Sequence, residues 1–288
     1  SPTFDAYQPL LEDAALTQLF HQSGQLFLYR NRQDMDKDTL THELRSESGA
    51  SIEFLNAEEI LEIEPAITPI FEAGYLMPDN GHCKDPFGLA NGLVKMFVQK
   101  GGDLVKADVL DFIFDADGVS GLSTSSVVLN TRRVVIAAGV WSKTLCERLG
   151  LPVPLESHRG YHATIENSNI SLRHMCFPVD YKFAITPMSM GLRIAGTVEF
   201  AGLGDPPNYE RVDKMIQSCH TILNGLNSEH HTRWMGHRPC LPDSLPIIGE
   251  SGKHPNIFFA FGHGHQGLVG ASQTGKVIDE IVRGVVPS

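Results

Sequence analysis

Apolar positions near the C-terminus change from the spacing of a strand to that of a helix. Residues 257–261 form an unbroken apolar run of strand length, and Gly262 and Gly264 interrupt it. From Leu268 onward the apolar spacing is helical. A strand, a glycine turn and a helix N-terminus in succession favour an electron-rich ligand, because free amide N–H groups and the helix dipole meet there. The apolar face of this helix carries Ala271, Gly275, Ile278 and Val282.

Helical spacing also recurs upstream, and two of the predicted helices have clear ends. One begins at the Asn56 cap and stops at Pro65, and the other follows Asp85-Pro86 and closes at Gly101. The remaining predicted helices cover 9–20, 38–48 with Leu40 and Leu44 inward, the segment after Gly139, and 209–226 with Val212, Met215, Ile216, Cys219 and Leu223 on a sheet.

Strand patterns fall into two groups. In the first half of the chain they cover 24–30, 104–114, 119–123, 126–130 and 134–138, the last being an apolar strand of the fully buried type. In the middle, 158–165, 181–188 and 191–200 are predicted to be antiparallel, with residues 188–191 as a hairpin turn. Alternating α/β segments therefore flank a middle segment of α+β character.

Composition narrows the function classes. The 288 residues are 42% hydrophobic, which supports one large domain or two modest ones, and the net charge of −11 argues against a nucleic-acid partner. Five scattered cysteines without a CxxC pair favour reduced thiols. No run of 18 apolar residues occurs, and the first residues lack the pattern of a signal peptide.

Two short motifs near the C-terminus lack the context that would give them meaning. Gly262, Gly264 and Gly267 satisfy GxGxxG, but no strand remains before Ser288 to complete a dinucleotide-binding unit. Residues 270–276 spell GxxxxGK, yet Val277 stands where a nucleotide-binding P-loop needs Ser or Thr. His263 and His265 have no nearby Cys or carboxylate to complete a metal shell, so no metal site is predicted.

The C-terminal stretch as a whole resembles the signature of the D-amino acid oxidase superfamily of FAD enzymes, and within it the bacterial D-amino acid dehydrogenase group. The several short motifs occur in the right order and spacing, and the likeness extends over nearly the whole chain. The features that carry it are Gly236-x-Arg238-Pro239, Asp243, Pro246, Ile248-Gly249, Gly262-His263-Gly264 and Gly267-Leu268.

This resemblance implies a fold and a cofactor. We expect an FAD-binding Rossmann-like domain over 79–150 and 235–288, and an antiparallel-sheet substrate domain over 1–78 and 151–234. The ADP-binding segment that begins such enzymes has no counterpart here, so we expect a truncated FAD-binding domain that binds FAD poorly by itself. The residues implied to contact the cofactor are Gly139, Gly236, Gly249, Gly262, His263, Gly264, Gln266, Gly267 and Leu268.

The resemblance also implies the chemistry of the intact enzyme. An amino acid is oxidised by hydride transfer from its α-carbon to the flavin, and the imino acid is hydrolysed to a keto acid and ammonia. Arg238 stands at the family's carboxylate-binding position, where a guanidinium pairs both oxygens. Tyr161 is implied as a lining residue of the substrate pocket, and His82 and His265 are further candidates.

Departures from the family leave alternatives open. Val269 replaces a threonine that many relatives carry, and Ala184 replaces a carboxylate-binding tyrosine of glycine oxidase. The alternatives are a glycine-, sarcosine- or proline-type oxidase of the same superfamily, or a binding module without catalysis. The resemblance further implies a cytoplasmic protein, with attachment to the inner face of the membrane and a quinone acceptor as an option for the full-length enzyme.

Overall fold

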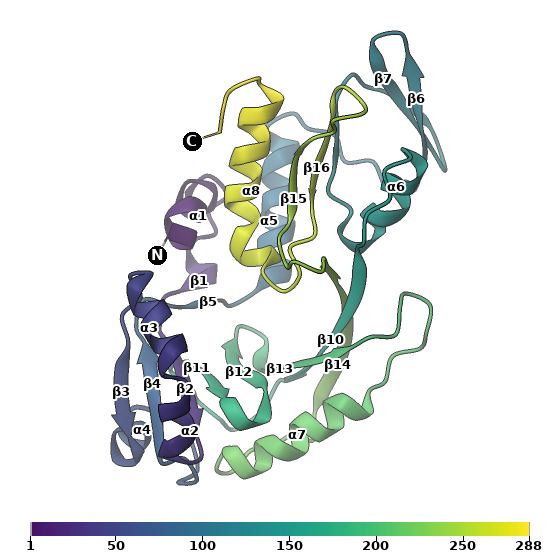
Figure 1. Cartoon of the computed structure of the whole chain (residues 1–288). Coiled ribbons are helices and arrows are strands. Elements are labelled where there is room, and N and C mark those ends of the chain that lie inside the picture. The colour runs from purple at the N-terminus through teal and green to yellow at the C-terminus, as the bar shows by residue number, and fades with distance from the viewer. Residues whose placement is uncertain (1, 288) are drawn as a thin grey trace.

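An eight-stranded sheet forms the lower half of the molecule in the computed structural model, which describes residues 2–287 (Figure 1). The strand order is β14-β10-β13-β12-β11-β2-β4-β3, and only the β11–β2 pair is parallel. The strands are β2 (Gln25–Tyr29), β3 (Glu53–Asn56), β4 (Ala73–Met77), β10 (Glu156–Ile165), β11 (Met175–Pro178), β12 (Phe183–Met188), β13 (Gly191–Glu199) and β14 (His231–Cys240).

Helices α4 (Ala57–Ile63) and α7 (Glu210–Ile222) cover one face of this sheet, with α7 along its lower side in Figure 1. The side chains predicted to pack on the sheet are all buried, and each contributes roughly 1.5–3 kcal/mol to stability. The predicted cap of α4 is confirmed, because the Asn56 side chain accepts from the Glu59 backbone N–H and the Glu59 carboxylate accepts from that of Asn56. A short 3-10 turn, η3 (Val179–Tyr181), links β11 to β12.

Helices α2 (Arg32–Lys37) and α3 (Thr39–Glu47) cover the opposite face at the β2–β4 edge. The inward face predicted for α3 is wrong, since Leu40 and Leu44 are 67% and 54% exposed. His42 points inward instead, at 8% exposure, with its ring 4.8 Å from that of Tyr75. The sheet here presents aromatic rings, and α3 turns its polar aromatic side chain toward them rather than its leucines.

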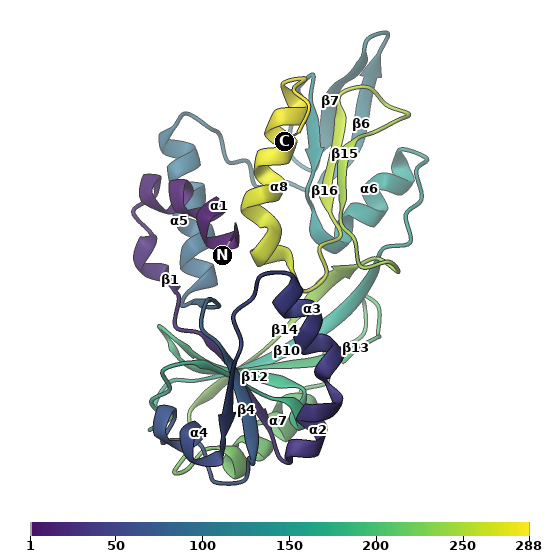
Figure 2. The same ribbon diagram turned by 60° about the vertical axis from the view of Figure 1, so that its left-hand side comes forward.

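The upper half is built around a three-stranded sheet in the order β15-β16-β9, with β16 and β9 parallel (Figure 2). Helix α8, which follows the glycine turn, lies beside this sheet. Helix α5, whose N-cap Asp85 side chain accepts from Gly88 N as predicted, lies on the other side of α8. The elements are α5 (Pro86–Gln99), β9 (Val134–Ile136), η2 (Gly139–Trp141), α6 (Ser142–Arg148), β15 (Ile247–Glu250), β16 (Ile257–Phe261) and α8 (Gly267–Val282).

Two predictions of burial in the upper half are wrong. Strand β9 is not fully buried, because Val135 is 43% exposed on an uncovered side of the small sheet. On α8 the predicted apolar face is only partly covered: Ala271 and Gly275 are exposed, whereas Ile278 is buried. In both cases an apolar surface lacks a covering layer among residues 2–287.

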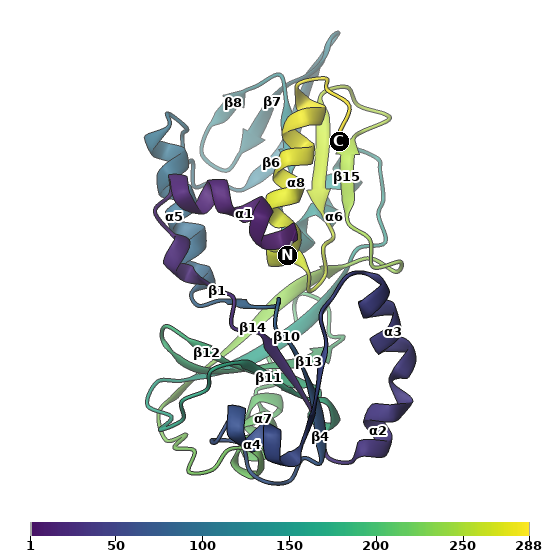
Figure 3. The ribbon, with the colours of Figure 1, turned by 90° about the vertical axis from the view of Figure 1, so that its left-hand side faces the viewer.

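The N-terminal segment differs from its predicted helix over 9–20. Helix α1 (Pro2–Asp13) contains Pro9, and a positive φ of 54° at Ala15 follows its end. The chain continues through η1 (Thr17–Leu19) to β1 (Phe20–His21), which pairs with β5 (His82–Cys83). Figure 3 shows α1 beside α5 and α8, and the Tyr7 hydroxyl donates to Leu268 O at 2.6 Å.

A small hairpin sheet completes the upper half. Its strands are β6 (Val109–Asp115), β7 (Gly118–Thr124) and β8 (Val128–Asn130), all antiparallel. The first strand begins at Val109 rather than at Leu104, which lies exposed in the preceding loop.

Candidate functional site

One face of the eight-stranded sheet is turned away from α7 and toward the upper half of the molecule. Cross-strand partners share a face, so the pairings from β14 to β12 define this one. Trp234 pairs with His162, which pairs with Ala195, and the next row holds Arg193. We call this surface the site face; its residues are Ala184, Thr186, His162, Arg193, Ala195, Trp234, Gly236 and Arg238.

The glycine turn after β16 lies directly beside the C-terminal end of β14. The backbone N–H of Gly264 donates to Pro239 O at 2.9 Å, so the turn is joined to the residue next to Arg238. Gly262 and Gly264 have φ angles of 91° and 55°, which L side chains rarely adopt. The structure therefore brings the predicted carboxylate-binding arginine and the predicted cofactor turn together.

Arg238 lies flat on the site face at its β14–β10 end. Its Nη1 donates to Thr197 O at 3.0 Å, and a Cβ on Gly160 would meet its guanidinium at 2.2 Å. Burial lowers the pKa of Arg238. Among residues 2–287 no carboxylate lies within 4.0 Å of it, so most of its donors remain for a ligand. It lines a small pocket of about 150 Å³ with His162 and Trp234.

The N-terminus of α8 presents backbone donors beside this pocket. Gln266 is the N-cap, and its side chain makes no capping hydrogen bond. The first N–H groups of a helix have no partner within it, and the helix dipole adds positive potential there. His263 is held by a hydrogen bond between its Nε2 and Thr274 Oγ1 at 2.8 Å, and burial lowers its pKa. Its imidazole is thus a neutral support of the turn.

A larger pocket of about 640 Å³ collects several predicted residues under the start of α8. His82, His265, Gln266 and Leu268 all line it. His82 donates from Nε2 to Pro187 O at 2.8 Å, and its pKa is lowered first by burial. The pocket combines apolar walls with a few polar groups, as small-molecule sites do.

Arg193 is the residue of this pocket that sequence reasoning missed. Its contacts are long, 3.4 Å from Nε to Thr164 Oγ1 and 3.8 Å from Nη2 to Met190 Sδ. Burial lowers its pKa, and no carboxylate of the described residues lies within 4.0 Å. The sequence could have indicated Arg193, because it lies between Leu192 and Ile194, which are both buried. Alternation along a strand then places the guanidinium on the opposite face of the sheet.

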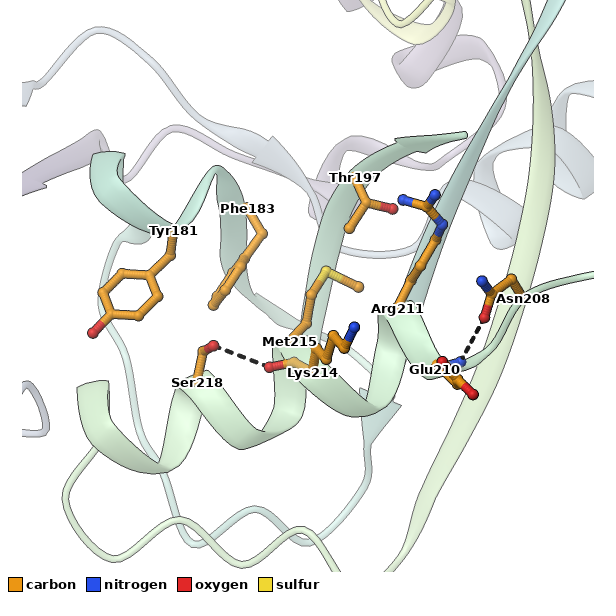
Figure 4. Close-up of a pocket in the computed structure, with 9 residues that line it drawn as sticks. All are labelled: Tyr181, Phe183, Thr197, Asn208, Glu210, Arg211, Lys214, Met215 and Ser218. Atoms are coloured by element: carbon orange, nitrogen blue, oxygen red, sulfur yellow. Dashed lines mark hydrogen bonds between the residues drawn. The ribbon is translucent and has the colours of Figure 1, made fainter. Parts of the chain in front are cut away.

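Tyr161 lies on the other side of the sheet, in the core beneath α7. Its hydroxyl donates to the Glu199 carboxylate and accepts from Asn208 N at 3.0 Å. Burial raises the pKa of Tyr161, while its hydrogen bond lowers that of Glu199. A pocket of about 330 Å³ on this α7 side is lined by Thr197, Asn208 and Arg211 among others (Figure 4). The ring of Tyr161 therefore lies on the α7 side of the sheet, although the residue also lines the small pocket of Arg238.

The remaining predicted glycines lie at three places. Gly139 follows β9, and the glycine turn that begins at Gly262 follows β16. Strands β9 and β16 are parallel, so both segments lie at the carboxyl ends of parallel strands, where such sheets bind ligands. Gly249 lies within β15, and nothing is within 4 Å of a Cβ built on it. Gly236 lies under the Trp234 indole, which a Cβ would meet at 1.9 Å. Contact of each glycine with a cofactor stays a prediction.

Comparison with known proteins decides the family. The DAO family, described as FAD dependent oxidoreductase, matches residues 2–281. The chain belongs to this family. As a DAO-family oxidoreductase it has FAD as the family's cofactor, which confirms the predicted fold class, cofactor and resemblance.

Individual relatives agree with this assignment. A D-amino-acid oxidase of Bradyrhizobium diazoefficiens is 33% identical over 285 residues, covering 98% of this chain and 68% of that protein. Glycine oxidase from Bacillus cereus has a TM-score of 0.87 at 20% identity, covering 98% of this chain and 79% of that one. L-proline dehydrogenase from P. horikoshii has a TM-score of 0.82 at 20% identity, covering 99% and 78%. The two structures show the same fold.

The residues present in this DAO-family chain fit one edge of a flavin. The turn at Gly262 and Gly264 brings backbone close to a flat ligand, and the uncapped start of α8 offers N–H donors for electron-rich atoms.

None of the helices within residues 2–287 has the length and apolar character needed to span a membrane.

Proposed function

We propose that the full-length enzyme oxidises an amino acid, preferentially a D-amino acid, at the carbon that bears the amine. The observation that carries this proposal is Arg238, a guanidinium without a carboxylate partner among the described residues, beside the glycine turn. A planar guanidinium recognises a substrate carboxylate by two parallel hydrogen bonds.

The chain's own residues orient the substrate. The bond from Arg238 to Thr197 O fixes the guanidinium, and the missing side chain at Gly160 gives it room to lie flat. Bound FAD supplies the redox chemistry by accepting a hydride. The sheet face holds the carboxylate so that the amine-bearing carbon faces the turn, and the start of α8 stabilises negative charge that develops there.

The D-amino acid preference rests on the 33% identical relative, which is a D-amino-acid oxidase. Ala184 and Ala195 pair on the site face next to His162 and leave that row without a hydroxyl group. This supports a substrate with a side chain that fills apolar space rather than a glycine-type substrate.

In the same proposal the reduced flavin passes its electrons to oxygen or to a quinone. Turnover of full-length protein with each acceptor separates an oxidase from a dehydrogenase.

The test is a kinetic comparison of Arg238→Leu with Arg148→Leu in full-length, FAD-bound protein. Arg148 is an exposed arginine on α6 and serves as the control. Loss of a charged hydrogen-bonded pair costs about 1.5–3 kcal/mol, so KM for D-amino acids should rise roughly 10- to 150-fold in the first variant only. FAD content, read from its absorbance, should stay the same. An unchanged KM with Arg238→Leu removes the proposed role, and equal turnover of L- and D-substrates removes the stereochemical preference.

A further inference from the structure

A second cavity, of about 760 Å³, lies beside β5 and is lined by several basic side chains. Four segments build it: the β1–β5 ribbon, the end of α4 at Ile63, residues 172–174 before β11, and the end of β12 at 187–189. It shares His82 and Met188 with the larger pocket of the site face, so the two cavities are neighbours. Its basic lining residues are His21, His82, Lys84, Arg173 and His174.

No acidic side chain of the described residues lines this basic cavity. Within residues 2–287, neither Lys84 nor Arg173 has a carboxylate within 4.0 Å of its side-chain nitrogens. The carboxylate nearest to the lining is that of fully buried Glu64, and its Oε1 is taken by His174 Nδ1 at 2.8 Å and by two backbone N–H groups. Glu64 therefore holds the His174 ring and the backbone at 173–174, and it makes no ion pair with Lys84 or with the Arg173 side chain.

Two buried polar atoms in the wall also lack partners. Ser23 Oγ and His82 Nδ1 are inaccessible to solvent and make no hydrogen bond within the described part of the chain. His82 is 9% exposed, and its other ring nitrogen is used by Pro187 O. Unsatisfied buried polar atoms are costly and uncommon, and a third, Glu64 Oε2, lies behind the same wall.

The cavity is basic, whereas the chain as a whole is acidic. The protein carries a net charge of −11, and such a protein repels anions in general. A local gathering of lysine, arginine and histidine without acids creates an attractive potential in one place, and low-dielectric walls strengthen it. Donors that converge from three segments match a group with several acceptor oxygens.

We propose that this basic cavity binds a small dianionic oxoanion, a phosphate group or a dicarboxylate. Lys84 supplies a point charge and Arg173 a fork of donors. The site is separate from the carboxylate-binding position at Arg238, and it does not depend on the function proposed above.

Binding should take up protons. Burial lowers the pKa of His21 and of His82, and the Lys84 charge lowers both further. The two rings face each other at 5.6 Å, while His174 faces Glu64. A bound anion offsets the Lys84 charge and stabilises the imidazolium forms, so affinity should increase as pH falls through about 6.5.

The experiment titrates inorganic phosphate, and separately the dicarboxylate fumarate, into full-length protein by calorimetry at fixed ionic strength. Lys84→Gln/Arg173→Gln should weaken binding at least about tenfold, whereas the control Lys95→Gln/Arg148→Gln removes the same charge from exposed positions outside the cavity and should leave it unchanged. Affinity for fumarate, which stays dianionic over this range, should be higher at about pH 6 than at about pH 8.

Each result of this titration bears on the proposal. Saturable binding that the cavity variant loses and the control keeps supports it, and the tighter of the two anions identifies the class. Equal binding by both variants shows general attraction to the surface and overturns it. Absence of saturable heat for both anions overturns it as well, provided that circular dichroism shows the unmodified protein to be folded.

Discussion

At the residue scale, the position of the Arg238 guanidinium depends on the absence of a side chain at Gly160. Its guanidinium lies over Gly160, whose missing side chain is the space that it fills. Sequence reasoning found Arg238 through its motif, but Gly160 has no distinguishing pattern of its own. Its importance follows from the β10–β14 pairing, which places Gly160 opposite Gly236. A residue whose role is to be small can be recognised only when the opposing strand is known.

Replacing Gly160 by alanine tests this dependence. A Cβ there would stand 2.2 Å from Nη2 of Arg238, so the guanidinium must move away from its bond to Thr197 O. We expect KM for the amino acid to rise about tenfold or more, with little change in FAD content, because the loss is one of substrate orientation. Gly204→Ala is the control, since nothing lies within 4 Å of a Cβ at that position. Equal kinetics in the two variants would show that Arg238 needs no such room.

Tyr161 shows the opposite limit of sequence reasoning at this scale. Its motif resembles that of a pocket aromatic, yet the regular alternation of β10 places Tyr161 on the same buried face as Ala163 and Ile165, beneath α7. There its hydroxyl completes the Glu199 network. The alternation of the strand predicts this inward position, whereas the motif does not. Its catalytic role stays a prediction, and the contacts described favour a structural one.

At the element scale, helices with a buried stripe and a chemical cap could be predicted, and elements formed by pairing could not. Helix α7 and the caps of α4 and α5 follow directly from spacing and from Asn56 and Asp85. Strand β14 was missed because His, Gly, Arg and Pro interrupt its apolar alternation. It is a strand because ten of its residues pair with β10. This element carries Arg238, so the site depends on tertiary pairing.

Helix α3 provides a test at this scale. Leu44→Gln should change the free energy of unfolding by no more than about 0.5 kcal/mol, because that side chain is mostly exposed. His42→Ala should cost about 1–3 kcal/mol, since it opens a cavity between Phe54 and Tyr75. Urea unfolding of both variants measures the difference. A larger loss of unfolding free energy for Leu44→Gln than for His42→Ala would show that the leucine face is buried, as the sequence pattern predicts.

At the scale of the whole molecule, the site face is assembled from segments that are far apart in sequence. Strand β11 pairs in parallel with β2, and the glycine turn near the C-terminus meets the end of β14. The family signature indicated Arg238 and the glycine turn as candidate site residues, and their roles stay predictions. It did not predict the basic cavity, because its lining comes from four segments without a motif.

Buried histidines make the stability of the whole molecule sensitive to mild acid. Burial is the main cause that lowers the pKa of His42 and His82, and it lowers that of His162, which also lies near Arg193, to about 4. Above about pH 6.5 these imidazoles are neutral in both the folded and the unfolded chain. As pH falls below that value the unfolded chain binds protons first, so the free energy of unfolding decreases until the folded value is reached.

For His162 the loss should approach about 1.4 kcal/mol per pH unit between roughly pH 6 and pH 5, and His42 and His82 add losses of the same sign. Urea unfolding across that interval measures it. His162→Asn should flatten the slope by up to that amount, whereas His230→Asn, at an exposed position, should leave it unchanged. Carboxylates such as Glu199, whose pKa is lowered, add a loss of the same sign only at lower pH. A stability that stays level from pH 7 to pH 5 would mean that His162 already has a solvent-like pKa in the folded protein, and that the site face around Trp234 is open to water.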